Sequence, residues 1–306
     1  MNMQTQIPLD VEPAAPASKA PTRVPTRVPT PADLEITVRD RRFGRGHTPA
    51  RWWLGGDPIA TAWHNALSAT FPRGEAFFIE AVKAHREGAP PKLEAEIRAF
   101  VRQEINHTRE HIAFNKIASD AGYDLAVIDA RLEANLAMTK NRPAIVNLAV
   151  TMALEHYTAM MAHDFLTNPA HFAGGDPEIA GMWRWHATEE IEHKGVAYDT
   201  WLHSTKDWSK WRRWKLKSLM MLIISYRFIT NRWNDTLGLL AQDGLTGWKW
   251  KARLVWYLAG TPGILRRIFP AWVAYFLPGF HPWNHDDRAL IAKAESEFAD
   301  AVMASA

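Results

Sequence analysis

Apolar and polar residues from Trp52 onward recur with the spacing of an α-helix, in long segments that hold few β-branched runs. No stretch alternates apolar and polar residues in the manner of a half-buried strand. We therefore predict an all-α protein. The predicted helices cover residues 58–69, 74–87, 91–120, 124–140, 143–166, 177–204, 208–234, 247–260 and 284–304.

Proline and glycine residues mark several of the predicted helix ends. Pro91 lies at the start of one helix, Gly122 follows its end, and Pro143 lies in the first turn of a later helix. Asp176 precedes Pro177, a pair that suits the N-cap and the first helical position. Several of these helices are long enough to pack side by side as a bundle.

The composition of the chain changes along its length and divides it into three regions. Residues 1–40 hold the near-repeat PTRVPTRVPT, a composition that cannot bury enough apolar surface to fold, so we predict a disordered tail. Residues 45–205 carry long helical segments and are predicted to form a bundle. Residues 206–306 are predicted to form a helical, Trp-rich C-terminal extension, because ten of the 15 Trp residues follow residue 200.

Composition also limits the chemistry. The chain has no cysteine, which excludes disulfides, thiolate-bound zinc, iron–sulfur clusters and cysteine nucleophiles. A bound metal must then be held by His, Asp and Glu, a ligand set that suits iron, manganese or zinc. The formal net charge of +3 is too small to favour nucleic acid as the main partner.

The sequence carries no sign of export or of a membrane span. The N-terminus lacks a charged region followed by an apolar one, as a secretory signal has. The most apolar run, LMMLIISY at residues 219–226, is too short to cross a bilayer. We predict a cytoplasmic protein, peripheral at most at the inner face of the membrane.

The segment HATEEIEHK at residues 186–194 carries two histidines and three glutamates within a predicted helix. His186, Glu190 and His193 stand at i, i+4 and i+7, so they share one face of that helix. In the earlier segment QEINHTREH, Glu104 and His107 stand at i and i+3. Each of the two helices therefore presents a Glu-x-x-His pair.

Two further glutamates lie in apolar helical segments. Glu155 lies at the centre of IVNLAVTMALEHYTAMM, and Glu75 lies among phenylalanines in FPRGEAFFIEAV. Glutamates in an apolar core are costly to desolvate unless metal ions neutralise them. Glu, Glu-x-x-His, Glu and Glu-x-x-His on four helices is the ligand order of ferritin-like di-metal carboxylate proteins. We predict a ferritin-like four-helix bundle with two metal ions; the alternative is that these residues are hydrogen-bonded or solvated.

Five motifs resemble those of a bacterial family named predicted metal-dependent hydrolase. They are WWLGGDP (52–58), LSATFPRGEAFF (67–78), QEINHTREH (103–111), LEHYTA (154–159) and HATEEIEHK (186–194). The motifs span residues 50–200, and the Trp-rich C-terminal part is similar in character. The resemblance implies a metal-dependent enzyme and, by the name of the family, a hydrolase.

The last motif also resembles the ligand set of di-iron arylamine N-oxygenases, which have one histidine more than ordinary di-iron oxidases. This resemblance implies that His186 is a metal ligand; the alternative is that His186 is hydrogen-bonded to one. His111 lies one turn beyond His107 and is predicted to contact the ligands rather than the metal. The predicted metal ligands are Glu75, Glu104, His107, Glu155, His186, Glu190 and His193.

From these residues we predict an enzyme with two metal ions, iron in preference to manganese or zinc. The predicted activity is that of an oxidase or oxygenase that uses O2 on an apolar or lipid-like small molecule. One alternative is hydrolysis by a water molecule that the metal activates. Another is a non-catalytic metal-binding bundle that docks on membranes.

The segment KDWSKWRRWKLK at residues 206–217 interleaves tryptophan with lysine and arginine. Basic and aromatic residues in this pattern favour the headgroup region of a membrane. The segment predicts a membrane-surface contact; the alternative is that its rings pack on the core.

Overall fold

The computed structural model of the chain describes residues 30–304, the last four by their backbone alone. Within that range every regular element is a helix, and the single β-bridge joins Leu54 to Gly175. The all-α prediction is therefore confirmed. The α-helices are α1 (Pro58–Ser68), α2 (Phe71–Lys83), α3 (Pro91–Asp120), α4 (Ala126–Ala137), α5 (Ala144–Thr167), α6 (Pro177–His193), α7 (Val196–Ser204), α8 (Lys210–Gln242), α9 (Trp248–Ala259), α10 (Ile264–Ala274) and α11 (Arg288–Ala304), with short 3-10 turns at Pro169–His171 and Pro282–Asn284.

The helix starts follow from their capping residues. The side chain of Asp57 accepts hydrogen bonds from the backbone N–H groups of Ile59 and Ala60 at the start of α1. Asp176 does the same for the second and third residues of α6, and Pro177 occupies the first position as predicted. Such caps satisfy backbone donors that have no partner inside the helix.

The helix predicted over residues 177–204 is wrong in one respect, because the structure divides it into α6 and α7. The chain turns at Lys194 and Gly195. A Cβ atom on Gly195 would lie 2.6 Å from the side chain of Thr30 and 2.9 Å from that of Trp283. Only glycine allows this close approach, and nothing in the local periodicity indicates it.

The predicted helix boundaries also differ from the structure around two prolines. We predicted a helix from residue 74, whereas α2 begins at Phe71 with Pro72 in its first turn, where the missing N–H costs nothing. The predicted set omits α10, which holds Pro270 in its interior. Proline usually ends a helix there because it lacks the N–H donor and clashes with the preceding turn.

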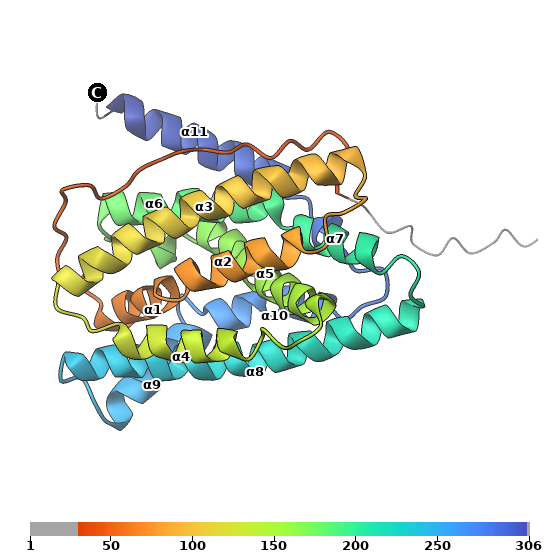
Figure 1. Cartoon of the computed structure of the whole chain (residues 1–306). Helices are drawn as coiled ribbons and strands as arrows, with labels where there is room; N and C mark the ends of the chain where they lie inside the picture. The colour runs from red at the N-terminus through yellow and green to blue at the C-terminus, as the bar shows by residue number, and fades with distance from the viewer. Residues whose placement is uncertain (1–29, 305–306) are drawn as a thin grey trace, which may run out of the picture.

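The helices α2, α3, α5 and α6 enclose a common interior (Figure 1). Helix α2 packs on α3 and α5, and α6 packs on the same two helices. These four helices carry all the predicted metal ligands. A closer relation to ferritin-like bundles stays a prediction.

Residues 30–43 form an extended segment, here called the strap, which runs along α3 and α6 before the chain enters α1 (Figure 1). The hydroxyl of Thr30 donates to Asp199 at 2.5 Å, and the backbone N–H of Phe43 donates to Glu110 at 3.0 Å. The disordered tail predicted over residues 1–40 falls mainly on residues 1–29, which lie outside the described residues. Residues 30–40 instead make specific contacts with the helices.

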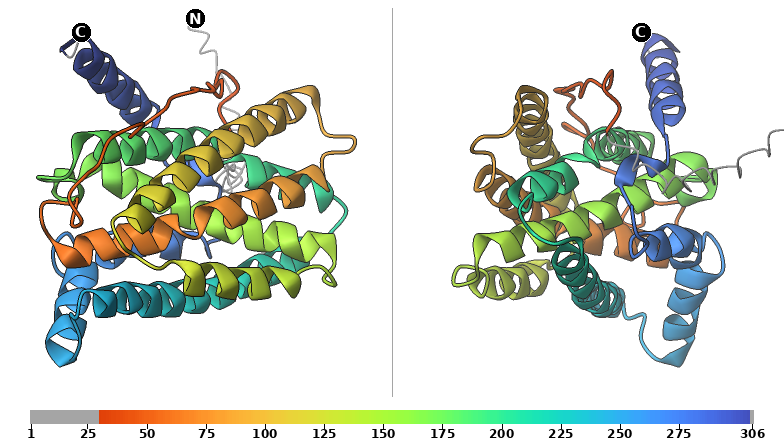
Figure 2. Two further views of the ribbon diagram at one scale, coloured as in Figure 1. Left: turned by 60° about the vertical axis from the view of Figure 1, so that its left-hand side comes forward. Right: turned by 90° about the vertical axis from the view of Figure 1, so that its right-hand side faces the viewer.

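The C-terminal helices cover one side of the four ligand-bearing helices. Helix α8 packs on α1 and α5, α10 packs on α5 and α9, and α4 lies alongside α8 in both views (Figures 1 and 2). Helix α11 contacts α6 and then projects from the body of the molecule (Figure 2). None of the helices between residues 30 and 304 has the length and apolarity needed to cross a bilayer.

Candidate metal centre

The structure brings all seven predicted ligands into one buried cluster. Glu75 comes from α2, Glu104 and His107 from α3, Glu155 from α5, and His186, Glu190 and His193 from α6. None of the seven exposes more than 4% of its surface. Their donor atoms form three overlapping groups, each with its atoms within 4.8 Å of one another: Glu75, His107 and His186; Glu104, Glu155 and His193; and Glu104, His107 and Glu190.

One half of the cluster surrounds His193. Its Nε2 lies 3.3 Å from Oε1 of Glu104, 3.5 Å from Oε2 of Glu155 and 3.4 Å from Oε2 of Glu190. Three carboxylate oxygens and one ring nitrogen thus face a single point.

The other half surrounds His107 and His186. Nδ1 of His107 lies 3.8 Å from Oε2 of Glu104 and 3.7 Å from Oε1 of Glu190. Nε2 of His186 lies 2.7 Å from Oε1 of Glu190 and 3.9 Å from Oε1 of Glu75. Glu104 and Glu190 therefore lie between the two halves, where bridging carboxylates would lie.

Many of the donor atoms that face this interior are buried and have no hydrogen-bond partner. They are Oε1 of Glu75, both carboxylate oxygens of Glu104 and Glu155, Oε2 of Glu190, Nδ1 of His107 and Nε2 of His193. Buried polar atoms are nearly always paired in folded proteins, so each exception needs an explanation. Here the unpaired atoms share one location, and cations among them would satisfy them together.

The outward-facing nitrogens of two histidines are held by residues from the opposite helix. Nε2 of His107 on α3 donates to Glu189 on α6 at 3.0 Å, and Nδ1 of His193 on α6 donates to Oε1 of Gln103 on α3 at 2.9 Å. The amide of Gln103 is oriented by its NH2 group, which donates to Glu192. These bonds leave Nδ1 of His107 and Nε2 of His193 as free electron pairs that face the cluster.

The strap supports the carboxylates that hold this arrangement. The backbone N–H of Arg39 donates to Glu189 at 2.8 Å, and that of Thr37 donates to Glu192 at 3.2 Å. The guanidinium of Arg39 also pairs with Glu192 at 2.6 Å. Glu192 thus lies buried under the strap.

A chain of hydrogen bonds fixes the protonation of His186. The NH2 group of Asn115 donates to the carbonyl of Ser68, so the amide oxygen accepts from the Ser68 hydroxyl at 2.7 Å. The serine oxygen then accepts from Nδ1–H of His111 at 2.8 Å, and Nε2 of His111 accepts from Nδ1–H of His186 at 2.6 Å. The remaining nitrogen of His186, Nε2, carries its lone pair toward Glu190. Two acceptors at 2.7 Å repel unless a cation or a proton lies between them.

The pKa values of the carboxyl groups in the cluster differ strongly from the ordinary value. Burial, and then the charge of nearby carboxylates, raises the pKa of Glu75, Glu104 and Glu155 well above the ordinary value. Burial alone would raise the pKa of Glu190 as well, but His193 and His186 outweigh it and lower the pKa well below the ordinary value.

The pKa values of the histidines are also shifted in both directions. Burial and the neighbouring His107 lower the pKa of His186 to about 4, so His186 is neutral at pH 7. Burial would lower the pKa of His107, but the hydrogen bond to Glu189 raises it. Burial and His186 lower the pKa of His111 well below its usual range. His111 contacts His186 rather than the point where the carboxylates meet.

These residues fit a pair of divalent cations. Four carboxylates and three imidazoles are ligands for iron, manganese or zinc, and Glu104 belongs to groups in both halves of the cluster. The raised carboxyl pKa values mean that these carboxylates lack enough positive charge nearby. Bound cations would supply that positive charge. That these seven residues bind metal stays a prediction.

Sequence reasoning missed Gln103 and Glu189, although both carry a signal. Each stands one residue before a ligand glutamate, so α3 and α6 repeat the pattern (Gln or Glu)-Glu-x-x-His. The first residue of each pattern binds the histidine of the other helix. The repeat therefore marks two helices that orient each other's ligands.

A second group of metal-binding residue types lies near the surface and also escaped the sequence analysis. It comprises His163, His285 and Asp287. Asp287 is already paired with the ammonium of Lys194 at 2.5 Å and accepts from His163 at 2.9 Å. Its charge is compensated within the protein, unlike that of the buried cluster.

Comparisons with known proteins bear on this geometry. Searches of curated proteins and of solved structures find no match. A family model described as "Predicted metal-dependent hydrolase" matches residues 37–286, from within the strap to the segment before α11. The candidate groups of His and Glu lie within that range and agree with a metal-dependent protein. The chain therefore belongs to the family of predicted metal-dependent hydrolases.

Proposed function

We infer that the chain is a di-iron enzyme that oxidises an apolar small molecule with O2. The observation that carries this proposal is the convergence of unpaired carboxylate oxygens and imidazole nitrogens from α2, α3, α5 and α6 on one buried interior. A single cation cannot satisfy so many donor atoms. Two cations held by these residues would satisfy them, as in ferritin-like di-metal proteins.

His186 serves as the seventh ligand in this proposal. The relay from Asn115 through Ser68 and His111 places the proton on its Nδ1 and presents its Nε2 to the cluster. A residue that only supported a ligand would donate a hydrogen bond into the site, and this nitrogen has none to donate. Nε2 of His186 and Oε1 of Glu190, which lie 2.7 Å apart, would then both hold a cation.

The charge of the ligands favours oxidation over hydrolysis. Hydrolytic zinc sites depend on a strongly acidic metal, and neutral imidazole ligands preserve that acidity. Four carboxylates donate negative charge, which weakens the acidity of the cations and stabilises higher oxidation states. When bound, two iron ions would supply electrons to O2.

The surroundings of the cluster also favour O2. Phe71 packs on the ring of His186 with centroids 4.8 Å apart, and Met161 and Phe165 line a small hollow beside His186 and Glu190. An apolar wall admits O2 and excludes water. The hydroxyl of Thr108 donates to Oε2 of Glu75 at 2.7 Å and leaves Oε1 toward the cluster.

The reaction balances with an external electron donor. In the oxygenase form, one O2, one substrate C–H bond, two electrons from a separate reductant protein and two protons yield one hydroxyl group and one water. The chain's own residues hold the cations, exclude water and position the substrate.

Hydrolysis is the second candidate, because the family to which the chain belongs is described as hydrolytic. In that case the same carboxylates and histidines would hold cations that activate water.

The test compares two metal loadings of the full-length chain. We expect anaerobically reduced, iron-loaded protein to consume O2 and to gain the near-ultraviolet absorption of ferric iron, whereas zinc-loaded protein does neither. The variant Glu104→Ala with Glu190→Ala should lose both responses. The matched control, Glu94→Ala with Glu178→Ala, changes two glutamates on the same helices that lie outside the cluster, the half-buried Glu94 and the exposed Glu178, and should retain both responses.

The opposite pattern would overturn the oxidation proposal. If iron-loaded protein consumes no more O2 than free iron, and zinc-loaded protein hydrolyses an ester at a rate that the Glu104/Glu190 variant abolishes, the enzyme is a hydrolase.

A further inference from the structure

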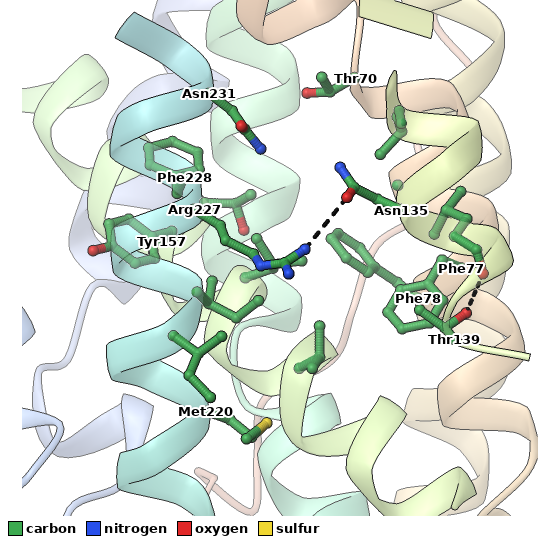
Figure 3. A pocket seen from close by; sticks show the side chains of 18 of the residues that line it. Thr70, Phe77, Phe78, Asn135, Thr139, Tyr157, Met220, Arg227, Phe228 and Asn231 are labelled. Atoms are coloured by element: carbon green, nitrogen blue, oxygen red, sulfur yellow. Dashed lines mark hydrogen bonds between the residues drawn. The ribbon is translucent and has the colours of Figure 1, made fainter. Parts of the chain in front are cut away.

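A large apolar cavity lies beside the metal centre, between α2, α4, α5 and α8 (Figure 3). Its volume is about 480 Å3, within the range of small-molecule binding sites. Leu67, Phe71, Thr158 and Met161 line both this cavity and the small hollow that touches His186 and Glu190. These shared residues place the cavity directly beside the hollow at the ligands.

Gly74 forms part of the cavity wall. It lies in α2 directly before Glu75, and a Cβ atom added there would meet no atom within 4 Å. Glycine in a helix is less favourable than alanine, and no close backbone approach requires it at this position. Its effect is to keep the space beside the centre open.

Two arginines at the cavity have no acidic partner in the described part of the chain. Arg227 reaches from α8 into the cavity, and it donates a hydrogen bond to the neutral side chain of Asn135 on α4 at 3.3 Å (Figure 3). Arg142, in the turn before α5, also lines the cavity and forms no ion pair with residues 30–304. A third arginine, Arg232, differs: it is buried and pairs with Asp235 at 2.5 Å.

We propose that this cavity binds an anionic amphiphile with a single acyl chain. Arg227, with Arg142 nearby, binds its carboxylate or phosphate, and its chain fills the apolar space toward Phe71 and Thr158. A guanidinium without a counter-ion matches the planar carboxylate with two parallel hydrogen bonds. The apolar wall matches the acyl chain. Because the arginines lie at one part of the cavity and the apolar wall near Phe71 and Thr158 lies toward the metal centre, the far end of the acyl chain is placed at that centre.

This inference names the substrate class of the proposed enzyme and so rests on that function, but the binding itself needs no turnover. The test therefore measures binding to the full-length protein with and without metal. Palmitate and hexadecanol compete with a fluorescent fatty acid, because the two differ in the charged head and share the chain. Palmitate is offered from dilute solution and, separately, from phosphatidylcholine vesicles.

We expect palmitate to bind at least about tenfold more tightly than hexadecanol, the effect of one hydrogen bond to a charged group. Arg227→Gln should weaken palmitate binding about tenfold and leave hexadecanol unchanged. Arg253→Gln, an exposed arginine on α9 outside the cavity, should change neither. Gly74→Leu should prevent both ligands from binding, whereas Gly74→Ala, which adds one methyl group in open space, should retain them.

Three results would overturn the proposal: equal binding of palmitate and hexadecanol, unchanged palmitate binding in Arg227→Gln, or unchanged binding in Gly74→Leu with a wild-type circular dichroism spectrum. Binding from solution or from vesicles supports it, and the faster of the two identifies the source of the ligand. Arg227-dependent binding without O2 consumption would retain the amphiphile site and reject only the oxidation. O2 consumption without palmitate binding would retain the oxidation and reject the amphiphile site.

Discussion

The helices α2, α3, α5 and α6 turn four glutamates inward, whereas α8, α9 and α10 turn large apolar side chains outward. Glu75 and Glu104 are fully buried, yet Trp248 is 81% exposed and Tyr226 is 72% exposed. Both arrangements run against the usual distribution of polar and apolar groups. The outward-facing apolar residues of α8 to α10 are Trp211, Leu219, Leu222, Ile223, Tyr226, Ile229, Trp248, Val255, Trp256, Phe269 and Val273.

Both regions hold side chains in an environment that is unfavourable unless a partner is bound. A buried charge without a partner and an exposed apolar surface are both unfavourable for an isolated chain. In the first region the partner that we propose is a cation. In the second, basic residues such as Lys215 and Arg253 stand among the exposed rings. That mixture suits an anionic lipid surface, and the membrane contact predicted for residues 206–217 stays a prediction.

The largest effect should come from removing inward-facing charge. We expect wild-type protein purified without chelators to hold two metal ions per chain, mainly iron, and Glu104→Ala with Glu190→Ala to hold none. Each substitution removes a carboxylate that lies between the two halves of the cluster. Elemental analysis measures the content, with Glu94→Ala plus Glu178→Ala as the matched control. Full metal content in the Glu104/Glu190 variant would contradict the assignment.

The stability of the metal-free protein should depend steeply on pH. The folded-state pKa values of Glu75, Glu104 and Glu155 are raised, so the folded protein keeps protons that the unfolded chain releases above about pH 4.5. These carboxyl groups alone make stability fall as the pH rises toward their folded-state pKa values. Below about pH 6.5 the lowered pKa values of His186 and His111 oppose that fall, because these histidines bind protons only in the unfolded chain, so the fall is steepest above about pH 6.5. Each proton that only the folded state retains lowers the free energy of unfolding by about 1.4 kcal/mol per pH step of one.

Glu190 adds no slope in that window, because its lowered pKa leaves it ionised in both states above pH 4.5. Denaturant unfolding of metal-free and metal-loaded protein between pH 5 and pH 8 measures the difference. We expect the metal-loaded protein to show a much smaller slope. Equal slopes would mean that metal does not neutralise these carboxylates.

A smaller effect should follow from Gln103→Leu. The amide oxygen of Gln103 accepts from His193 and orients its ring, and loss of such a partner weakens metal affinity about tenfold to a hundredfold. Competition with a chelator measures the affinity. Gln242→Leu removes a glutamine that binds Asp124 far from the cluster and should leave the affinity unchanged. Equal metal affinities in the Gln103 and Gln242 variants would show that Gln103 does not support the metal centre.

The smallest effect concerns the outward-facing region. If α8 lies on anionic membranes, Lys215→Gln should lower binding to anionic vesicles about fivefold, since one basic residue contributes about 1 kcal/mol near such a surface. Binding of the wild type should also weaken as salt rises. Lys116→Gln on α3, which pairs with Asp120, is the control. Binding that ignores lipid charge and salt would leave the rings without this role.

Local spacing was sufficient to predict the helices that carry the ligands and the faces they share. Glu190 and His193 lie on one face because three residues nearly complete a helical turn, and no tertiary information is needed for that step. The break at Gly195 depends on Trp283, almost ninety residues later, and therefore could not be read locally. The support from Arg39 could not be read either, because the strap has no periodicity that links it to α6.

The cavity was also beyond the sequence. Gly74, Asn135 and Arg227 come from three different helices and are far apart in the chain. Apolar periodicity predicts that a face is buried, and it does not predict whether the facing side chains fill the space between helices. The volume left over depends on side-chain sizes across several helices at once.

The strap has a consequence for how the protein is made. Arg39 leaves the ribosome early, but its partner Glu189 follows 150 residues later. The ligands themselves extend from Glu75 to His193, so a growing chain has no complete centre until α6 has emerged. Contacts of such long separation form late in folding, after the helices have paired. A complete set of donor atoms for the proposed metal ions therefore exists only in chains whose translation has passed residue 193.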